Sequence, residues 1–185
     1  AEDLDRFLGR ANGDLGGLPL AHRAFGVLEA AVLREPRGTP DEQAGGVDLA
    51  LCSDISVASD RATFRVPELL RGIADTLISA RLPQQIGMAR AKYLIFTAEK
   101  IDAFEAERIG LVAKVVAAKE LESHVAWVVE QVRATGPAAR AALKRDMNAQ
   151  LPAFDLAAFL ESTRSPEMHE GVRAFLEKRP PRWPR

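Results

Sequence analysis

The chain of 185 residues is poor in the residues that build metal centres and covalent cross-links. It has one cysteine, Cys52, and three histidines, His22, His124 and His169, which lie far apart in the sequence. A disulfide needs two cysteines, and zinc sites gather histidines and cysteines at short spacings. We therefore expect no disulfide and no metal. Because its neighbours are apolar, we interpret Cys52 as a buried, inert thiol of a reducing, cytoplasmic compartment, in preference to a nucleophile.

Long hydrophobic runs and an excess of one charge are also lacking. No apolar segment approaches the ~20 residues that span a bilayer, and the N-terminal AEDLDRFLGR is too acidic for a signal peptide. The net charge is -1, so nothing in the composition indicates a nucleic-acid partner. With 47% hydrophobic and 28% charged residues, the chain is expected to be globular, with no membrane partner.

The spacing of apolar residues predicts mixed α/β structure in the first part of the chain. Apolar residues at helical spacing predict a helix over 19–33, and polar turn formers predict a loop over 37–43. Alternating patterns predict strands over 55–58 and 62–66, joined by a tight return at 59–61.

The second part of the chain is predicted to be mainly helical. Asp75 and Thr76 are suited to cap a helix that ends before Pro83, and Gly110 is suited to end another. A β-branched stretch predicts one further strand over 111–116. The other expected helices cover residues 88–96, 103–109, 119–135, 137–150 and 152–178, the last interrupted near 165–166.

The segment AGGVDL, residues 44–49, places a glycine pair directly before an acid and an apolar stretch. Two interpretations follow from these residues alone. The glycines form a plain turn that needs positive φ, or they expose backbone amides at a helix N-terminus to a ligand.

Several longer motifs occur in order after this segment. They are GGVDLALCSDISVASDRATFRVPELLRG, ARLPQQIGMARAKYL, TAEKIDAFEAERIGLVAKVV and EGVRAFLEKRPPRW. On these motifs the chain resembles the crotonase superfamily, the enoyl-CoA hydratase/isomerase group, over about residues 44–183. The resemblance implies an α/β fold: a spiral of ββα turns over residues 1–135 and a C-terminal helical trimerisation region over 136–185.

The resemblance also implies an activity and its site. The substrate is expected to be an acyl-CoA thioester, with coenzyme A part of the substrate and no separate cofactor, and the protein is expected to be a homotrimer or hexamer. Gly45 and Glu2 match positions whose backbone N–H groups hold the thioester oxyanion. Asp48 and Glu68 match the two acids that move protons. Taken alone, Asp48 is a first-turn acid stabilised by the helix dipole, and Glu68 is a solvated acid after a proline.

Three further residues have two interpretations each. Asp75 resembles an aspartate of the dienoyl-CoA isomerase branch, although one residue is missing between Glu68 and Asp75; otherwise it is the N-cap of the next helix. Phe175 and Lys178 match positions that contact CoA in relatives, often from a neighbouring subunit. Lys178 is equally suited to a basic helix end that complements the dipole.

The chain departs from the family pattern before residue 44. The motif that Ala1–Leu4 resembles is preceded in the family by strands, and RGTPDEQ replaces the buried strand before the glycines. We therefore expect an incomplete N-terminal part of the core. Three functions stay open: an enoyl-CoA hydratase/isomerase, a dienoyl-CoA isomerase, and an inert protein that binds acyl-CoA or assists assembly.

Overall fold

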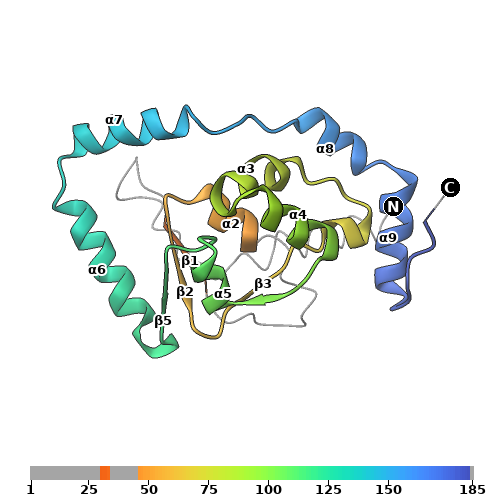
Figure 1. Ribbon diagram of the computed structural model, residues 1–185, viewed down its shortest axis with the longest axis horizontal. Helices are drawn as coiled ribbons and strands as arrows, with labels where there is room; N and C mark the ends of the chain where they lie inside the picture. The colour runs from red at the N-terminus through yellow and green to blue at the C-terminus, as the bar shows by residue number, and fades with distance from the viewer. Residues whose placement is uncertain (1–29, 34–45, 184–185) are drawn as a thin grey trace.

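A three-stranded parallel sheet lies at the centre of the computed structural model, which describes residues 30–33 and 46–183 (Figure 1). Its strands are β1 (Ala30–Leu33), β2 (Ile55–Ser59) and β5 (Lys114–Val116), in the order β1-β2-β5. The middle strand β2 is buried from Ser56 to Ser59, as is usual for a parallel strand covered on both faces.

Strand β1 corrects one expectation. The helix predicted over 19–33 is wrong at Ala30–Leu33, which pairs with β2 in the register Val32 to Val57. The remainder of that predicted helix lies outside the described residues. The run AAVL is short and apolar, and such a run fits a strand as well as a helix turn, so its pairing with β2 decides the outcome.

The two strands expected at 55–58 and 62–66 belong to different sheets, and the second of these sheets is the smaller. β3 (Thr63–Phe64) pairs in antiparallel fashion with β4 (Ile101–Asp102), and not with β2. The chain does turn after β2, where the Ala62 N–H donates to the Ser59 carbonyl at 2.9 Å. The turn therefore passes the chain from one sheet to the other.

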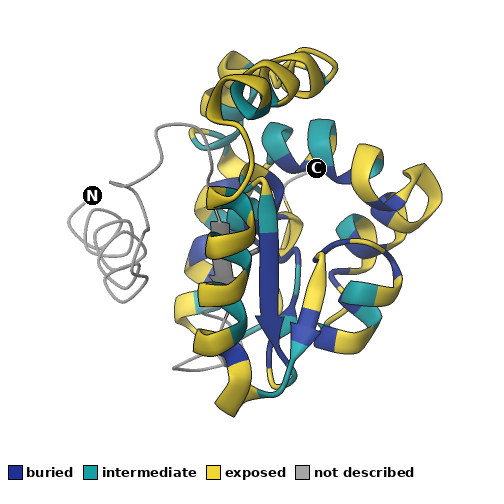
Figure 2. Cartoon of the chain, turned by 90° about the vertical axis from the view of Figure 1, so that its left-hand side faces the viewer, coloured by how far each residue is buried: buried dark blue, intermediate teal, exposed yellow. Residues whose placement is uncertain are grey.

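Helices enclose the sheets and supply most of the core (Figure 2). Their buried faces include Val47, Ile78 and Leu82, and the outer faces are exposed. The helices of this body are α2 (Gly46–Cys52), η2 (Glu68–Arg71), α3 (Thr76–Ile86), α4 (Met88–Thr97) and α5 (Ala103–Arg108).

Helix α3 continues through Pro83, which the sequence had suggested as its end. A proline inside a helix removes one backbone hydrogen bond and crowds the preceding turn. Here Leu82 and Ile86 are buried on either side of it, and the Gly87 N–H donates to the Pro83 carbonyl at 3.0 Å. Burial of that apolar face offsets the lost bond.

The C-terminal third is helical, as predicted. In Figure 1 its first helices run along the edge of the molecule, and the last returns to the body. No side chain of α7 or α8 is buried, whereas α9 buries Met168, Gly171, Val172 and Ala174. The elements are η3 (Ala118–Glu120), α6 (Leu121–Arg133), α7 (Pro137–Asn148), α8 (Leu156–Ser162) and α9 (Pro166–Leu176).

Two glycines allow α9 to lie against the backbone of η2. Gly72 ends η2 with φ +67, and a Cβ there would stand 2.5 Å from the Glu167 carbonyl carbon. Gly171 is buried in α9, and a Cβ there would overlap the main chain of Arg71. Since real Cβ atoms do not approach so closely, both positions require glycine, and α9 fixes the short helix that carries Glu68.

None of the helices within 30–33 and 46–183 has the length and apolar character needed to cross a membrane.

Gly171→Ser tests the backbone contact between η2 and α9. We expect a loss of about 1–3 kcal/mol in the free energy of unfolding, because the added side chain forces two backbones apart. Gly136→Ser is the matched control, since nothing lies within 4 Å of a Cβ at this N-cap and serine is a good N-cap residue. Urea unfolding followed by circular dichroism measures both. Equal stability of the two variants would contradict the close packing of η2 and α9.

Candidate active site

Asp48 lies in the first turn of α2 and is partly buried. Its Oδ1 atom is shielded from solvent and has no hydrogen-bond partner among the described residues. Burial, with a smaller contribution from the negative charge of Asp75, raises the pKa of Asp48 from 3.8 to about 6. The carboxyl therefore gains and loses its proton close to neutral pH.

Glu68 opens η2, directly after Pro67, and is 9% exposed. Burial raises the pKa of Glu68 from 4.5 to about 7, and the charges of Asp48 and Asp75 add to this effect. A hydrogen bond to its own backbone and the Arg71 charge act in the opposite direction. Its Oε2 atom is buried and has no partner in the described part of the chain. The solvated acid that the local sequence suggested is thus wrong.

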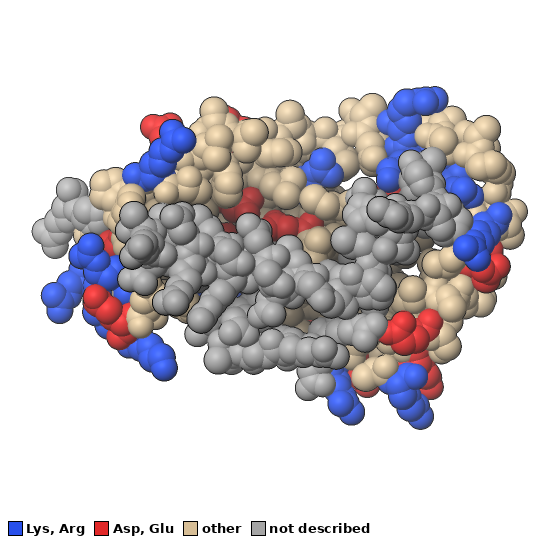
Figure 3. All heavy atoms as spheres, turned by 180° about the vertical axis from the view of Figure 1, so that it is seen from behind, with Lys and Arg blue, Asp and Glu red and all other residues tan. Residues whose placement is uncertain are grey.

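Asp75 is the N-cap of α3, one of the two roles that its sequence allowed. Its Oδ1 accepts a hydrogen bond of 3.0 Å from the Ile78 N–H. Its charge also acts on both Asp48 and Glu68, so the structure brings the three acids together from α2, η2 and the start of α3. Figure 3 shows acidic side chains near the middle of one face, with a basic group beside them and charged groups of both signs toward its ends.

The two raised pKa values decide what this cluster can do. At neutral pH, like charges and burial leave part of the Asp48 and Glu68 population protonated. A carboxylate accepts a proton and a carboxylic acid donates one, so neighbouring acids of this kind suit general acid–base chemistry. Within 30–33 and 46–183, no group of histidines, cysteines and acids is arranged to hold a metal ion.

An apolar recess lies between α2 and the β3–β4 sheet. Its lining includes Val47, the neighbour of Asp48 in α2, and reaches across to the β3–β4 sheet. None of the three acids lines it. The residues around it are Val47, Phe64, Arg65, Val66, Leu82, Leu94, Glu99, Ile101 and Leu111.

Phe175 and Lys178 lie at the end of α9. Phe175 is partly buried, and its ring centroid stands 4.6 Å from the guanidinium carbon of Arg71. Lys178 is exposed and has a left-handed backbone with φ 52. The Lys178 N–H donates to the Phe175 carbonyl at 3.1 Å, and the Arg179 N–H donates to the Ala174 carbonyl at 3.0 Å. These two bonds form a Schellman motif, in which glycine usually takes the position of Lys178.

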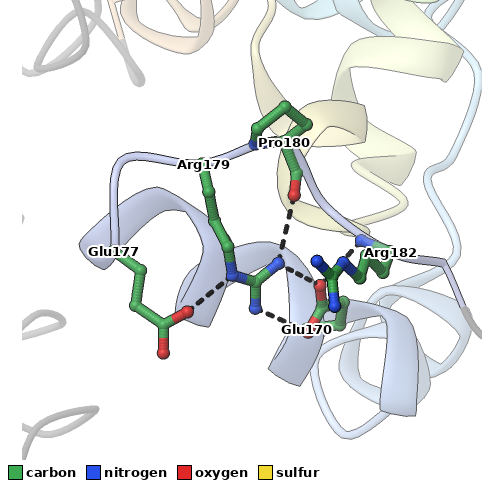
Figure 4. Close-up of polar contacts among 5 residues, drawn as sticks. All are labelled: Glu170, Glu177, Arg179, Pro180 and Arg182. Carbon is green, nitrogen blue, oxygen red and sulfur yellow. Dashed lines mark hydrogen bonds and ion pairs between the residues drawn. The ribbon is translucent and has the colours of Figure 1, made fainter.

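Arg179 fastens the segment after α9 to the helix (Figure 4). Its Nη1 lies 2.6 Å from Glu170 Oε1, and its Nε lies 2.6 Å from Glu177 Oε2. The Arg182 N–H also donates to Glu170 Oε1 at 2.7 Å, and these contacts lower the pKa of Glu170 to about 2. Lys178 is therefore held between a helix end and an anchored segment.

The two expected oxyanion positions, Gly45 and Glu2, lie outside the described residues. Helix α2 begins at Gly46, so the helix that the AGGVDL segment suggested is present. Cys52, at the end of α2, is exposed, and the expectation of a buried thiol is wrong because α2 presents its last residue to solvent.

Sequence reasoning missed Arg71. It is only 6% exposed, stacks on Phe175 and acts on Glu68. A signal was present, because Glu68 and Arg71 are three residues apart in PELLRG, and such a spacing brings side chains to one face of a 3₁₀ helix.

Known proteins resemble this chain over most of its described part. The sequence model of the family described as "Enoyl-CoA hydratase/isomerase" matches residues 41–185. The short-chain-enoyl-CoA hydratase of Clostridium acetobutylicum is 34% identical over 96% of this chain and 70% of its own length. The crotonyl-CoA hydratase of Syntrophomonas wolfei is 36% identical over 73% of this chain and 55% of its own.

Solved structures agree with this relationship. An enoyl-CoA hydratase from Mycobacterium avium subsp. paratuberculosis has a TM-score of 0.69 at 26% identity, over 85% of this chain and 64% of the other. A carnitinyl-CoA dehydratase from Mycobacterium avium has a TM-score of 0.65 at 30% identity, over 76% and 59%. The predicted crotonase-like α/β fold is confirmed. The chain spans less than two thirds of most of these relatives.

Glu68→Gln tests the buried carboxyl through stability. A folded-state pKa of about 7, above the usual 4.5, means that the folded protein holds the Glu68 proton more tightly than the unfolded chain. Wild type therefore loses stability as the pH rises from about 4 to 8, whereas glutamine has no proton to lose. We expect equal stability near pH 4 and a gain of about 1–3 kcal/mol for the variant at pH 8.

Urea unfolding at several pH values measures this difference. The control is Glu161→Gln, which removes an exposed carboxylate from α8 and should leave the pH dependence of wild type intact. If the free energy of unfolding of Glu68→Gln varied with pH in parallel with that of wild type between pH 4 and 8, the burial of this acid would be contradicted.

Proposed function

This chain belongs to the enoyl-CoA hydratase/isomerase family, and on that premise we propose that it converts enoyl-CoA thioesters by moving protons with Glu68 and Asp48. The observation that carries the proposal is the pair of carboxyls, Glu68 buried and Asp48 partly buried, whose pKa values are raised to about 7 and about 6. Relatives that share its sequence are named enoyl-CoA and crotonyl-CoA hydratases.

Hydration needs both protonation states of a carboxyl. The ionised Glu68 carboxylate takes a proton from a water, whose oxygen bonds to Cβ of the enoyl thioester. The electron pair of the double bond moves to the thioester carbonyl and forms an enolate. Cα then receives one proton from the acid pair; if Asp48 gives it, the proton on Glu68 passes to Asp48, so that one water is added and both carboxyls regain their starting states.

The enolate oxygen needs hydrogen-bond donors already directed at it. Backbone N–H groups serve this purpose because they require no reorganisation when the charge develops. We propose Gly45 and Glu2 for these donors on the resemblance of AGGVDL and AEDL to the family motifs. The start of α2 at Gly46, with Asp48 inside its first turn, supports this position for the thioester.

Isomerisation is the alternative that a specific observation favours. Asp75 acts electrostatically on both other acids, as a third proton-carrying group of the dienoyl-CoA isomerase type would. In that reaction one acid removes a proton from the substrate, and a proton is returned at another carbon. The cap bond to Ile78 shows that Asp75 also has a structural role.

We propose that Phe175 and Lys178 contribute to the binding of the CoA moiety. Lys178 keeps an exposed ammonium group at a backbone position that glycine would occupy with less strain. A cation so placed suits a phosphate.

We further propose a homotrimer or hexamer, formed through the C-terminal region of residues 136–185. Large apolar side chains are exposed on α7, α8 and the segment that joins them, and such groups favour contact with another protein surface. They are Leu143, Met147, Phe154, Leu156 and Leu160. We also propose a cytoplasmic location, because the chain has a single cysteine, and a role in fatty acid metabolism, because of the thioester chemistry.

Turnover of crotonyl-CoA and of a 3,5-dienoyl-CoA, followed by absorbance on the full chain, tests the activity. We expect Glu68→Gln to lower kcat by about 10²–10⁴-fold, because glutamine cannot transfer the proton. Glu161→Gln should turn over at the wild-type rate. A folded wild-type chain that binds an acyl-CoA in calorimetry without turning over any enoyl thioester would instead favour the inert binding or assembly protein.

Asp75→Asn separates the electrostatic role from the cap. Asparagine keeps the N-cap bond, and the loss of charge lowers the pKa values of Asp48 and Glu68. We expect isomerase activity to be abolished, hydration to be only weakened, and the pH optimum of hydration to move to lower pH. Asp155→Asn, at the N-cap of α8, is the matched control. Equal loss of both activities would remove the special role of Asp75.

Lys178→Gly separates strain from binding. We expect it to raise the free energy of unfolding by about 0.5–1 kcal/mol, because glycine adopts positive φ freely. The affinity for CoA, measured by calorimetry, should fall severalfold with the loss of the ammonium charge, and Lys178→Arg should retain it. Unchanged CoA affinity in the glycine variant would contradict the binding role.

A further inference from the structure

Arg71 is buried three residues after Glu68, in the same short helix. Its side chain belongs to the last turn of η2, and Glu68 belongs to the first. Because a 3₁₀ helix has three residues per turn, both side chains leave the same face. A buried guanidinium is thereby held on the side of η2 from which the Glu68 carboxyl projects.

Two contacts from α9 hold Arg71 in this position. The Phe175 ring lies against the guanidinium, with 4.6 Å from its centroid to the guanidinium carbon. One helical turn earlier, Gly171 lies directly on the Arg71 main chain. The side chain and the backbone of Arg71 are therefore both fixed by one helix, and the ion pair between Arg179 and Glu170 fastens the segment after that helix to it.

We infer that Arg71 is a positioning residue for Glu68, and that Phe175 of α9 keeps its guanidinium beside the acid cluster. This inference goes beyond the proposed function and rests on it only where activity is measured. It also gives Phe175 a role within its own chain, separate from contact with CoA.

The charges around Glu68 come from three elements. Asp48 on α2 and Asp75 at the start of α3 oppose ionisation of Glu68, and Arg71 on η2 favours it. Arg71 is thus the cation that offsets two anions, and its removal should make Glu68 hold its proton to higher pH.

Helix α9 also carries charged groups, and their partners matter for the test. Glu170 is engaged by Arg179, and Arg173 acts on Glu170. Glu167 lies in the first turn of α9, where its backbone contacts Gly72. Arg173→Met is the control for Arg71→Met. It removes one arginine charge from α9, but Arg173 is exposed and its loss leaves the stacking of Arg71 on Phe175 intact.

The deciding measurement is the titration of the Glu68 side-chain carboxyl in the full chain, by carbon NMR of labelled protein, with Glu68→Gln assigning the signal. We expect Arg71→Met to raise the midpoint by about one pH unit. Phe175→Leu should shift it in the same direction by less, and Arg71→Lys should restore most of the wild-type value. Arg173→Met should leave it unchanged.

An unchanged midpoint in folded Arg71→Met, or an equal shift in Arg173→Met, would overturn the inference. Should Arg71→Met fail to fold, Phe175→Leu and Arg71→Lys decide the inference. An unchanged Glu68 midpoint in Phe175→Leu would overturn the role of α9. The pH profile of hydration should move with the NMR midpoint. If no thioester is turned over but the midpoints shift as expected, the proposed function fails and the positioning role of Arg71 stands.

Discussion

The backbone contact between η2 and α9 is the constraint on which the candidate site depends. Glu68 and Arg71 lie at the two ends of a single short helix, and a 3₁₀ helix of four residues has little stability of its own. Its geometry is imposed from outside, by Gly171 on one side and by the positive φ of Gly72 at its end. The position of the buried carboxyl is thus set by a helix about a hundred residues further along the chain.

Burial of the acids opposes stability, and the surroundings compensate for it. Asp48 and Glu68 are removed from water next to a third carboxylate, an arrangement that favours the neutral form of each. The body that carries them is closely packed around Ile78 and Leu82, which have almost no exposed surface. A rigid apolar body of this kind can keep charged groups in unfavourable surroundings, as general acid–base chemistry near neutral pH requires.

Much of the fold was predictable, because most helices of this chain have clear starts and stops. Asp75, Asp102 and Ser165 each accept a cap hydrogen bond from the backbone three residues later, and Gly110 follows α5 as expected. The errors fall where local pattern is ambiguous. A four-residue apolar stretch became β1 because β2 was available to pair with it, and no local signal contains that information.

The motifs pointed to Asp48, Glu68 and Asp75, and the structure brings these three acids together. Their electrostatics was not predictable, because Glu68 after a proline looked solvated and its burial arises from packing between distant elements. The local spacing placed Arg71 on the same face as Glu68, but its neighbours Phe175 and Gly171 are remote in sequence and meet it only through the return of α9.

That return also explains why α9 differs from α7 and α8. All three belong to the C-terminal region, yet among them only α9 has a glycine that lies against the main chain of the body, which lets two backbones touch. Helices α7 and α8 present larger apolar side chains outward and bury none of them within the chain. The C-terminal third therefore contains one helix that packs against the segment carrying Glu68 and two helices whose large apolar side chains are exposed. The same region of sequence thus fixes the acid cluster from one side and leaves an apolar surface on the other helices.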